Sequence, residues 1–153
     1  MFWSVFFRTM YGFLRVVDPI IRFVWRRRVV GLERVADLRV PGRRSGRERA
    51  TLVTVLDVDG RWYVGHPNGA AEWTRNVDTA DVAELHFAGR DGPAFVRPIR
   101  LYGGPEREAV IRATWSQHPF PGNVIYALAR RRVRDVGVYF RLNPVPSPAS
   151  EPA

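Results

Sequence analysis

One segment does most to decide the fold, and it reads PGRRSGRERATLVTVLDV from Pro41 to Val58. A proline–glycine turn opens the segment and leads into a loop rich in glycine and arginine. From Thr51 to Val58 the side chains alternate in the way that is typical of a half-buried strand. Asp59-Gly60 then supplies the residues of a tight hairpin turn. The segment therefore predicts an antiparallel sheet in which a basic loop precedes one strand.

The loop itself, residues 42–49, contains four arginines, two glycines and a serine. Glycines allow backbone N–H groups to approach a ligand, and guanidinium groups match the paired oxygens of phosphates and carboxylates. The loop therefore indicates a binding site for an anionic small molecule. A solvated basic turn is the alternative, and the loop taken alone favours it.

The rest of the chain predicts a small barrel of about six strands. Further strands are expected at residues 37–40, 61–65, 82–88, 94–102 and 136–142, and helices at residues 72–77, 106–115 and 124–132. Hairpin links dominate, so the sheet should be mostly antiparallel and the class α+β. The barrel domain is expected over residues 35–143. The Pro-, Ser- and Ala-rich tail, residues 144–153, is expected to be disordered.

Residues 1–34 are expected to form an N-terminal amphipathic helical segment. Its apolar residues recur at helical spacing: Trp3, Phe6, Phe7, Met10, Phe13, Leu14 and Val17. Asp18-Pro19 marks the start of a second helix. Arginines interrupt the apolar runs, which argues against a secretory signal or a transmembrane helix. Two interpretations of this segment stay open: a helix packed on the protein's own core, and an interfacial helix resting on a membrane.

The charge is concentrated at the front of the chain. The formal net charge is +9 over 153 residues, every basic residue is arginine, and cysteine is absent. Residues 1–49 carry 12 arginines against 4 acids. The basic surface is therefore expected in the first third, where nucleic acid, anionic lipid and an anionic cofactor are all possible partners. Few aromatics lie among the arginines of the loop, which disfavours nucleic acid.

Several kinds of chemistry find no support in the sequence. His66, His86 and His118 are far apart and lack metal-ligand spacing. The serine of residues 42–46 does not lie in the Gly-x-Ser-x-Gly motif of hydrolases. Without cysteine or lysine the chain has no thiolate or Schiff-base nucleophile. If the protein is an enzyme, the chemistry is expected to come from a bound cofactor.

A series of short motifs carries a resemblance to a known family. Gly42-Arg43-Arg44-Ser45-Gly46 is followed by a hairpin, then Asn68-Gly69, Trp73-Thr74-Arg75-Asn76-Val77 and, near the end, Val138-Tyr139-Phe140-Arg141-Leu142-Asn143-Pro144. The series resembles the deazaflavin (F420)-dependent nitroreductases and quinone reductases of actinobacteria over roughly residues 30–144. The resemblance implies a split β-barrel, similar to FMN-binding barrels, with an N-terminal amphipathic helix and two later helices.

The resemblance also implies roles for named residues. Cofactor binding would fall on eleven of them: Arg43, Arg44, Ser45, Arg49, Leu52, Val53, Asn68, Gly69, Ala70, Trp73 and Asn76. The arginine loop would hold the phosphate and oligoglutamate tail of coenzyme F420. Tyr126 and Phe120 would shape the pocket of the reacting substrate. Trp73 also fits a plain core position, and Asn76 also fits a helix-end cap.

The function implied is hydride transfer from reduced F420 to a quinone or a similar lipophilic acceptor, in the cytoplasm or peripherally on the inner face of the cell membrane. The alternatives are a non-catalytic F420 carrier, a flavin or haem protein on the same barrel, and a basic module that binds lipid or nucleic acid. A homodimer is a further expectation, since an apolar front helix could serve a dimer as well as a membrane.

Overall fold

The computed structural model describes residues 32–120 and 122–148. The helices predicted at the front of the chain and the second half of the tail lie outside these residues. Within the described part, no helix has both the length and the apolar run that a bilayer span requires. The boundaries expected for the N-terminal segment and for the tail stay predictions.

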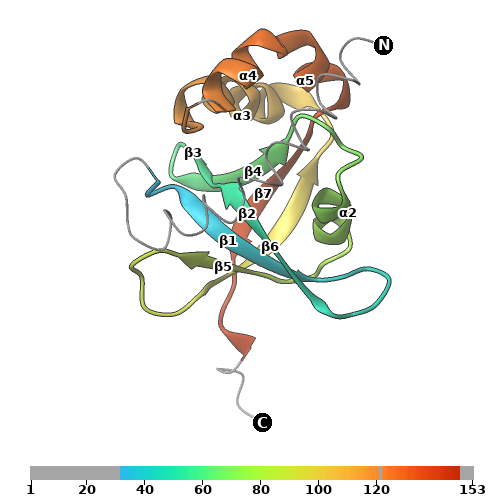
Figure 1. Ribbon diagram of the computed structural model, residues 1–153, viewed down its shortest axis with the longest axis vertical. Coiled ribbons are helices and arrows are strands. Elements are labelled where there is room, and N and C mark those ends of the chain that lie inside the picture. Colours follow the sequence, from blue (N-terminus) through green and yellow to red (C-terminus); the bar gives the residue numbers. More distant parts are fainter. Residues whose placement is uncertain (1–31, 121, 149–153) are drawn as a thin grey trace.

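Seven strands form one curled antiparallel sheet in the order β2-β1-β5-β6-β7-β4-β3 (Figure 1). The elements in chain order are β1 (Val35–Pro41), β2 (Glu48–Thr54), β3 (Leu56–Val58), β4 (Arg61–His66), α2 (Glu72–Asp78), β5 (Ala83–Phe87), β6 (Ala94–Leu101), α3 (Gly104–Gln117), α4 (Gly122–Leu128), α5 (Arg130–Val136) and β7 (Val138–Pro144). Helices α3, α4 and α5 gather at one end of the sheet, and α2 lies beside it. The α+β class and the antiparallel sheet are confirmed, and the arrangement is consistent with a split barrel.

The two outermost strands of the sheet come from one continuous segment. The single strand predicted at residues 51–58 is wrong: the chain bends at Val55, whose N–H donates to the carbonyl of Arg34 at 2.7 Å. β2 pairs with β1, whereas β3 pairs with β4 at the other end of the strand order. Because the two halves have different partners, the segment must turn from one sheet edge to the other. The sheet curls into a barrel at this bend.

β7 serves two separate cores because its side chains alternate between the two faces of the sheet. Phe140 and Leu142 join the core inside the curled sheet, together with Leu38, Val64, Leu85 and Val96. Tyr139 joins a second core under the helices, together with Leu56, Ile111 and Val133. The helical end is therefore fixed to the sheet by its own buried cluster.

The late helical region differs from the sequence prediction. The helix predicted at residues 124–132 is two helices, and the backbone leaves the helical conformation at Ala129 (φ −89°, ψ 20°). The last strand begins at Val138 and not at Val136, because α5 continues to Val136. Gly137 then closes α5 by donating its N–H to the carbonyl of Val133 at 3.0 Å. α3 is also longer than predicted, since it begins at Gly104 and ends at Gln117.

Candidate functional site

The basic loop joins β1 to β2 as a closed turn. The N–H of Gly42 donates to the carbonyl of Arg47 at 2.8 Å, and the N–H of Gly46 donates to the carbonyl of Gly42 at 2.7 Å. Gly46 has a φ of +67°, a conformation that favours glycine. The hydroxyl of Ser45 accepts the N–H of Arg47 at 3.3 Å. These bonds use the glycine N–H groups within the turn, so the loop presents guanidinium groups to a ligand.

Helix α2 holds the loop through direct contacts to Arg43. The buried side chain of Asn76 accepts the N–H of Arg43 through Oδ1 at 3.2 Å. The guanidinium of Arg43 donates to both carboxylate oxygens of Glu72, at 2.5 and 3.5 Å. The side chain of Asn76 thus fixes the loop, while the C-cap of α2 is Thr79.

Loop and helix enclose a cavity of about 390 Å³. The lining comes from the loop, the start of β2 and α2: Gly42, Arg43, Arg44, Ser45, Arg49, Ala50, Thr51, Glu72, Trp73 and Asn76. Six of the eleven residues predicted to bind a cofactor therefore meet at one cavity, although 29 positions separate Arg43 from Glu72. We call this the arginine cavity.

The other five predicted cofactor residues are not among those that line the arginine cavity. Val53 is buried in the core inside the sheet, and Leu52 precedes it on β2. Asn68, Gly69 and Ala70 form a tight loop against the end of α5 and the start of β7. The N–H of Gly69 donates to the carbonyl of Val136 at 3.0 Å. A Cβ on Gly69 would lie 2.5 Å from a methyl group of Val138, so this glycine allows close packing.

The arginine cavity carries more positive than negative charge. The side chains of Arg44 and Arg49 make no hydrogen bond or ion pair within residues 32–120 and 122–148. Glu72 is the one carboxylate among the described lining residues. Its hydrogen bond from Arg43 holds the pKa of that carboxyl below its usual value. The cavity therefore offers two uncommitted guanidinium groups to an anion.

Glu72 was not predicted from the sequence, and its replacement tests the charge of the cavity. We expect Glu72→Gln to tighten the binding of an anionic ligand by about tenfold, because the change removes a nearby negative charge and releases Arg43. The amide oxygen can still accept a hydrogen bond from Arg43. Phosphate or F420 titration by calorimetry measures the change.

Glu84→Gln is the matched control, since Glu84 lies on β5 away from the arginine cavity. Equal tightening in both variants would mean that only the overall charge matters. Weaker binding in Glu72→Gln would show that the pair with Glu72 is what holds Arg43 in place.

The two residues predicted to shape a substrate pocket lie in the helical layer. Tyr126 is buried on α4, where its ring stacks on His118 at 4.3 Å between centroids. Its hydroxyl donates to the carbonyl of Gly65 at 3.4 Å. Phe120 is 80% exposed. Neither Tyr126 nor Phe120 lines the arginine cavity. His66 contacts Trp73, which does line the cavity, with 5.7 Å between the ring centroids.

The stacked histidine gives the fold a predicted pH dependence. Burial, with the nearby His66 as a second cause, lowers the pKa of His118 from 6.5 to about 4. The unfolded chain therefore takes up the proton first as the pH falls. This stabilising contribution is full above the unfolded pKa and is lost as the pH falls towards the folded one. Between about pH 7 and about pH 5 we expect a loss of about 2 kcal/mol.

Urea denaturation of His118→Phe measures this contribution, because phenylalanine keeps an aromatic ring against Tyr126. The variant should lose part of the slope between the two pH values, and His66 should supply the rest, because burial lowers the pKa of His66 as well. His86→Asn should keep the slope, since His86 pairs with Glu84 near the surface. A wild-type slope in His118→Phe would contradict the assignment.

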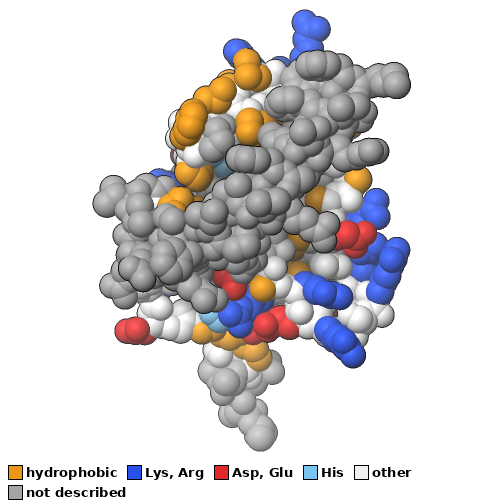
Figure 2. Space-filling view, viewed as in Figure 1, with side chains coloured by type: hydrophobic (Ala, Val, Ile, Leu, Met, Phe, Trp, Pro, Cys, Tyr) orange, Lys and Arg blue, Asp and Glu red, His pale blue; other side chains and the backbone are white. Residues whose placement is uncertain are grey.

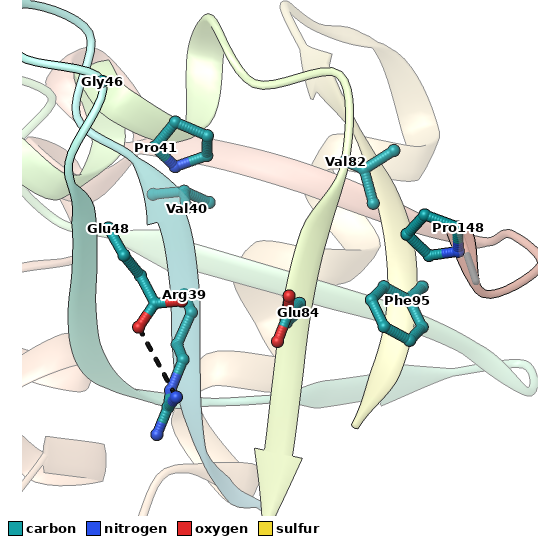
Figure 3. Close-up of a pocket in the computed structure, with 9 residues that line it drawn as sticks. All are labelled: Arg39, Val40, Pro41, Gly46, Glu48, Val82, Glu84, Phe95 and Pro148. Carbon is teal, nitrogen blue, oxygen red and sulfur yellow. Dashed lines mark hydrogen bonds and ion pairs between the residues drawn. The ribbon is translucent and has the colours of Figure 1, made fainter. Parts of the chain in front are cut away.

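A second cavity, of about 230 Å³, lies on another part of the sheet (Figure 3). Arg39 donates there to Glu48 at 3.5 Å and also to Asp37 at 3.3 Å. Glu84, on the neighbouring strand, pairs with His86 at 2.9 Å. Val82, Phe95 and Pro148 form the apolar side of this cavity. Its lining has two carboxylates, Glu48 and Glu84, and one arginine, which makes the arginine cavity the better candidate for an anion.

No protein-family model and no curated protein matches this chain. Solved structures do resemble it. HutZ, the haem storage protein from Vibrio cholerae, matches with a TM-score of 0.56 and 13% identity, over 86% of this chain and 92% of HutZ. The protein Atu2129 of unknown function from Agrobacterium tumefaciens matches with a TM-score of 0.49 and 19% identity, over 73% of this chain and 48% of its own.

An F420-H2 dependent reductase, FDR-A, matches with a TM-score of 0.45 and 16% identity, over 71% of this chain and 93% of FDR-A. At these identities a likeness shows a shared fold alone, and the match to HutZ is the one of these three whose TM-score exceeds 0.5. This chain spans about half the length of Atu2129. Evidence for the function of this chain therefore has to come from the arginine cavity.

Proposed function

We propose that this protein binds coenzyme F420 at the arginine cavity and transfers a hydride from the reduced cofactor to a quinone or a similar lipophilic acceptor. One observation supports the proposal most strongly. Arg43, Arg44 and Arg49 converge with Trp73 and Asn76 on one cavity, as the resemblance to F420-dependent reductases implies.

The residues present fit the anionic part of F420. A phosphate followed by several carboxylates needs several fixed cations, and guanidinium groups bind such oxygens in pairs. Arg44 and Arg49 are uncommitted within the described residues, and the N–H of Arg43 is fixed by Asn76. These three arginines would hold the phosphate and tail.

The remaining residues would orient the reactants. Reduced F420, when bound, supplies the hydride donor. Trp73 would close the side of the arginine cavity that faces His66, and the resemblance implies that Leu52 and the Asn68–Ala70 loop lie nearer the ring. Tyr126 would shape the acceptor pocket in the helical layer. The protein would then act by holding donor and acceptor ~3–3.5 Å apart and by excluding water.

A titration followed by an anaerobic turnover assay tests this function. Oxidised and reduced F420 are each titrated into the full chain, and menaquinone is then added to the reduced complex. Binding with oxidation that depends on menaquinone supports the reductase. Binding without oxidation favours a carrier. Lack of F420 binding, together with a copurified chromophore that has a haem spectrum, would contradict the proposal.

A further inference from the structure

The helical end of the molecule exposes large apolar side chains that no bound cofactor explains. Phe120 is 80% exposed, Leu128 74% and Val124 44%. Val124 and Leu128 lie one turn apart on α4 and therefore share a face, while Tyr126 and Ile125 pack inwards on the core under the helices. We call Val124 and Leu128, together with Phe120 just before α4, the α4 apolar face. Large apolar side chains exposed at one end of a protein indicate an interaction surface.

Basic residues follow this face directly. Residues 120–134 contain four arginines and no acidic residue. Arg131 is exposed, and its side chain makes no hydrogen bond or ion pair within residues 32–120 and 122–148. The exposed Arg130 lies over the ring of Trp115 at 5.5 Å, which leaves its positive charge near the surface. Figure 2 shows hydrophobic side chains gathered over the helical end of the molecule, with Lys or Arg side chains beyond them.

The size of the surface distinguishes between possible occupants. A stable dimer buries about 800 Å² on each partner, and three side chains at a convex helix end provide much less. A membrane interface requires less area, because a few apolar side chains enter the headgroup boundary while nearby arginines meet anionic lipid. The apolar face and its arginines match those two requirements.

We propose that the α4 apolar face, with Arg130 and Arg131, docks this protein peripherally on an anionic lipid bilayer. Phe120, Val124 and Leu128 enter the interface, and the two arginines contact lipid phosphates. This inference does not depend on F420 binding, because none of these residues lines the arginine cavity.

Cosedimentation of the full chain with vesicles tests the proposal at physiological salt. Vesicles of equal parts phosphatidylcholine and phosphatidylglycerol should bind the wild type, and phosphatidylcholine alone should bind it far less. Val124→Ser/Leu128→Ser should reduce binding at least tenfold. Arg130→Gln/Arg131→Gln should reduce it about thirtyfold, the effect expected for two basic residues near anionic lipid. Tyr102→Ser, which also removes an exposed aromatic side chain (83% exposed), should bind as the wild type does.

Failure of the wild type to bind would overturn the proposal, and so would unchanged binding in both double variants. Circular dichroism checks that the variants remain folded. Sedimentation equilibrium without lipid tests the other possible occupant of the face, a second copy of this chain. If Val124→Ser/Leu128→Ser turns a dimer into a monomer, the face is a contact between two copies of this chain and the lipid proposal is wrong.

Discussion

Replacing Arg44 and Arg49 together by glutamine is expected to weaken F420 binding by two to three orders of magnitude. Both residues line the arginine cavity, and neither guanidinium group makes a hydrogen bond or ion pair among the described residues. A hydrogen bond to a charged group contributes roughly 1.5–3 kcal/mol, so the loss of two such contacts accounts for an effect of this size. Stability should change little, since neither side chain supports the fold. Fluorescence titration with oxidised F420 measures the affinity.

Arg47→Gln is the matched control for this experiment. Arg47 belongs to the same loop but does not line the arginine cavity. Its replacement removes one positive charge, where the double variant removes two. Its backbone bonds to Gly42 and Ser45 are unaffected by the change. An equal loss of affinity in Arg47→Gln would mean that general electrostatic attraction explains the binding. Unchanged affinity in the double variant would exclude the arginine cavity as the site.

Gly65→Ala is expected to destabilise the fold by about 3 kcal/mol, the upper part of the range for an overpacked core. Gly65 on β4 lies directly opposite Tyr139 on β7. The ring of Tyr139 lies over the glycine, and a Cβ there would be 2.5 Å from its Cε1 atom. Tyr139 is fully buried, so its ring cannot move aside without disturbing the core under the helices. Urea denaturation measures the loss.

Two further variants decide whether the ring is the cause. Gly103→Ala should cost about 1 kcal/mol or less, the preference of an N-cap for glycine over alanine. A Cβ at Gly103 meets nothing within 4 Å, and its φ of −178° suits any residue. In a Tyr139→Leu background, Gly65→Ala should cost less than in the wild type, because the ring is gone. Additive costs would show that the clash is not what destabilises Gly65→Ala.

Strand periodicity in the sequence was enough to place most of the sheet. It predicted strands close to β4, β5 and β6, where hairpin turns and alternation agree. It could not predict the bend at Val55, because the alternation continues from Thr51 to Val58 without a break. The bend arises from pairing with two different neighbours, β1 and β4, which is a property of the closed sheet.

The candidate site was also predicted only in part from the sequence. The arginine loop was visible as a basic turn, and the order of the motifs linked it to Trp73 and Asn76. The partner of Arg43 could not be predicted, because Glu72 reads as an ordinary acidic residue in the first turn of a helix. Asn68 and Gly69 look equally suited to a ligand loop in the sequence. In the structure Gly69 packs on β7, and Asn68 accepts the N–H of Ala70 at 3.0 Å, contacts that the sequence did not predict.

The most direct measurement is a crystal structure of the full chain in complex with oxidised F420. We expect the cofactor phosphate or the first tail carboxylate within hydrogen-bonding distance, about 3 Å, of the guanidinium of Arg44 or Arg49. Trp73 should lie against the same ligand. A complex in which every anionic group of the cofactor lies outside the arginine cavity would contradict the account.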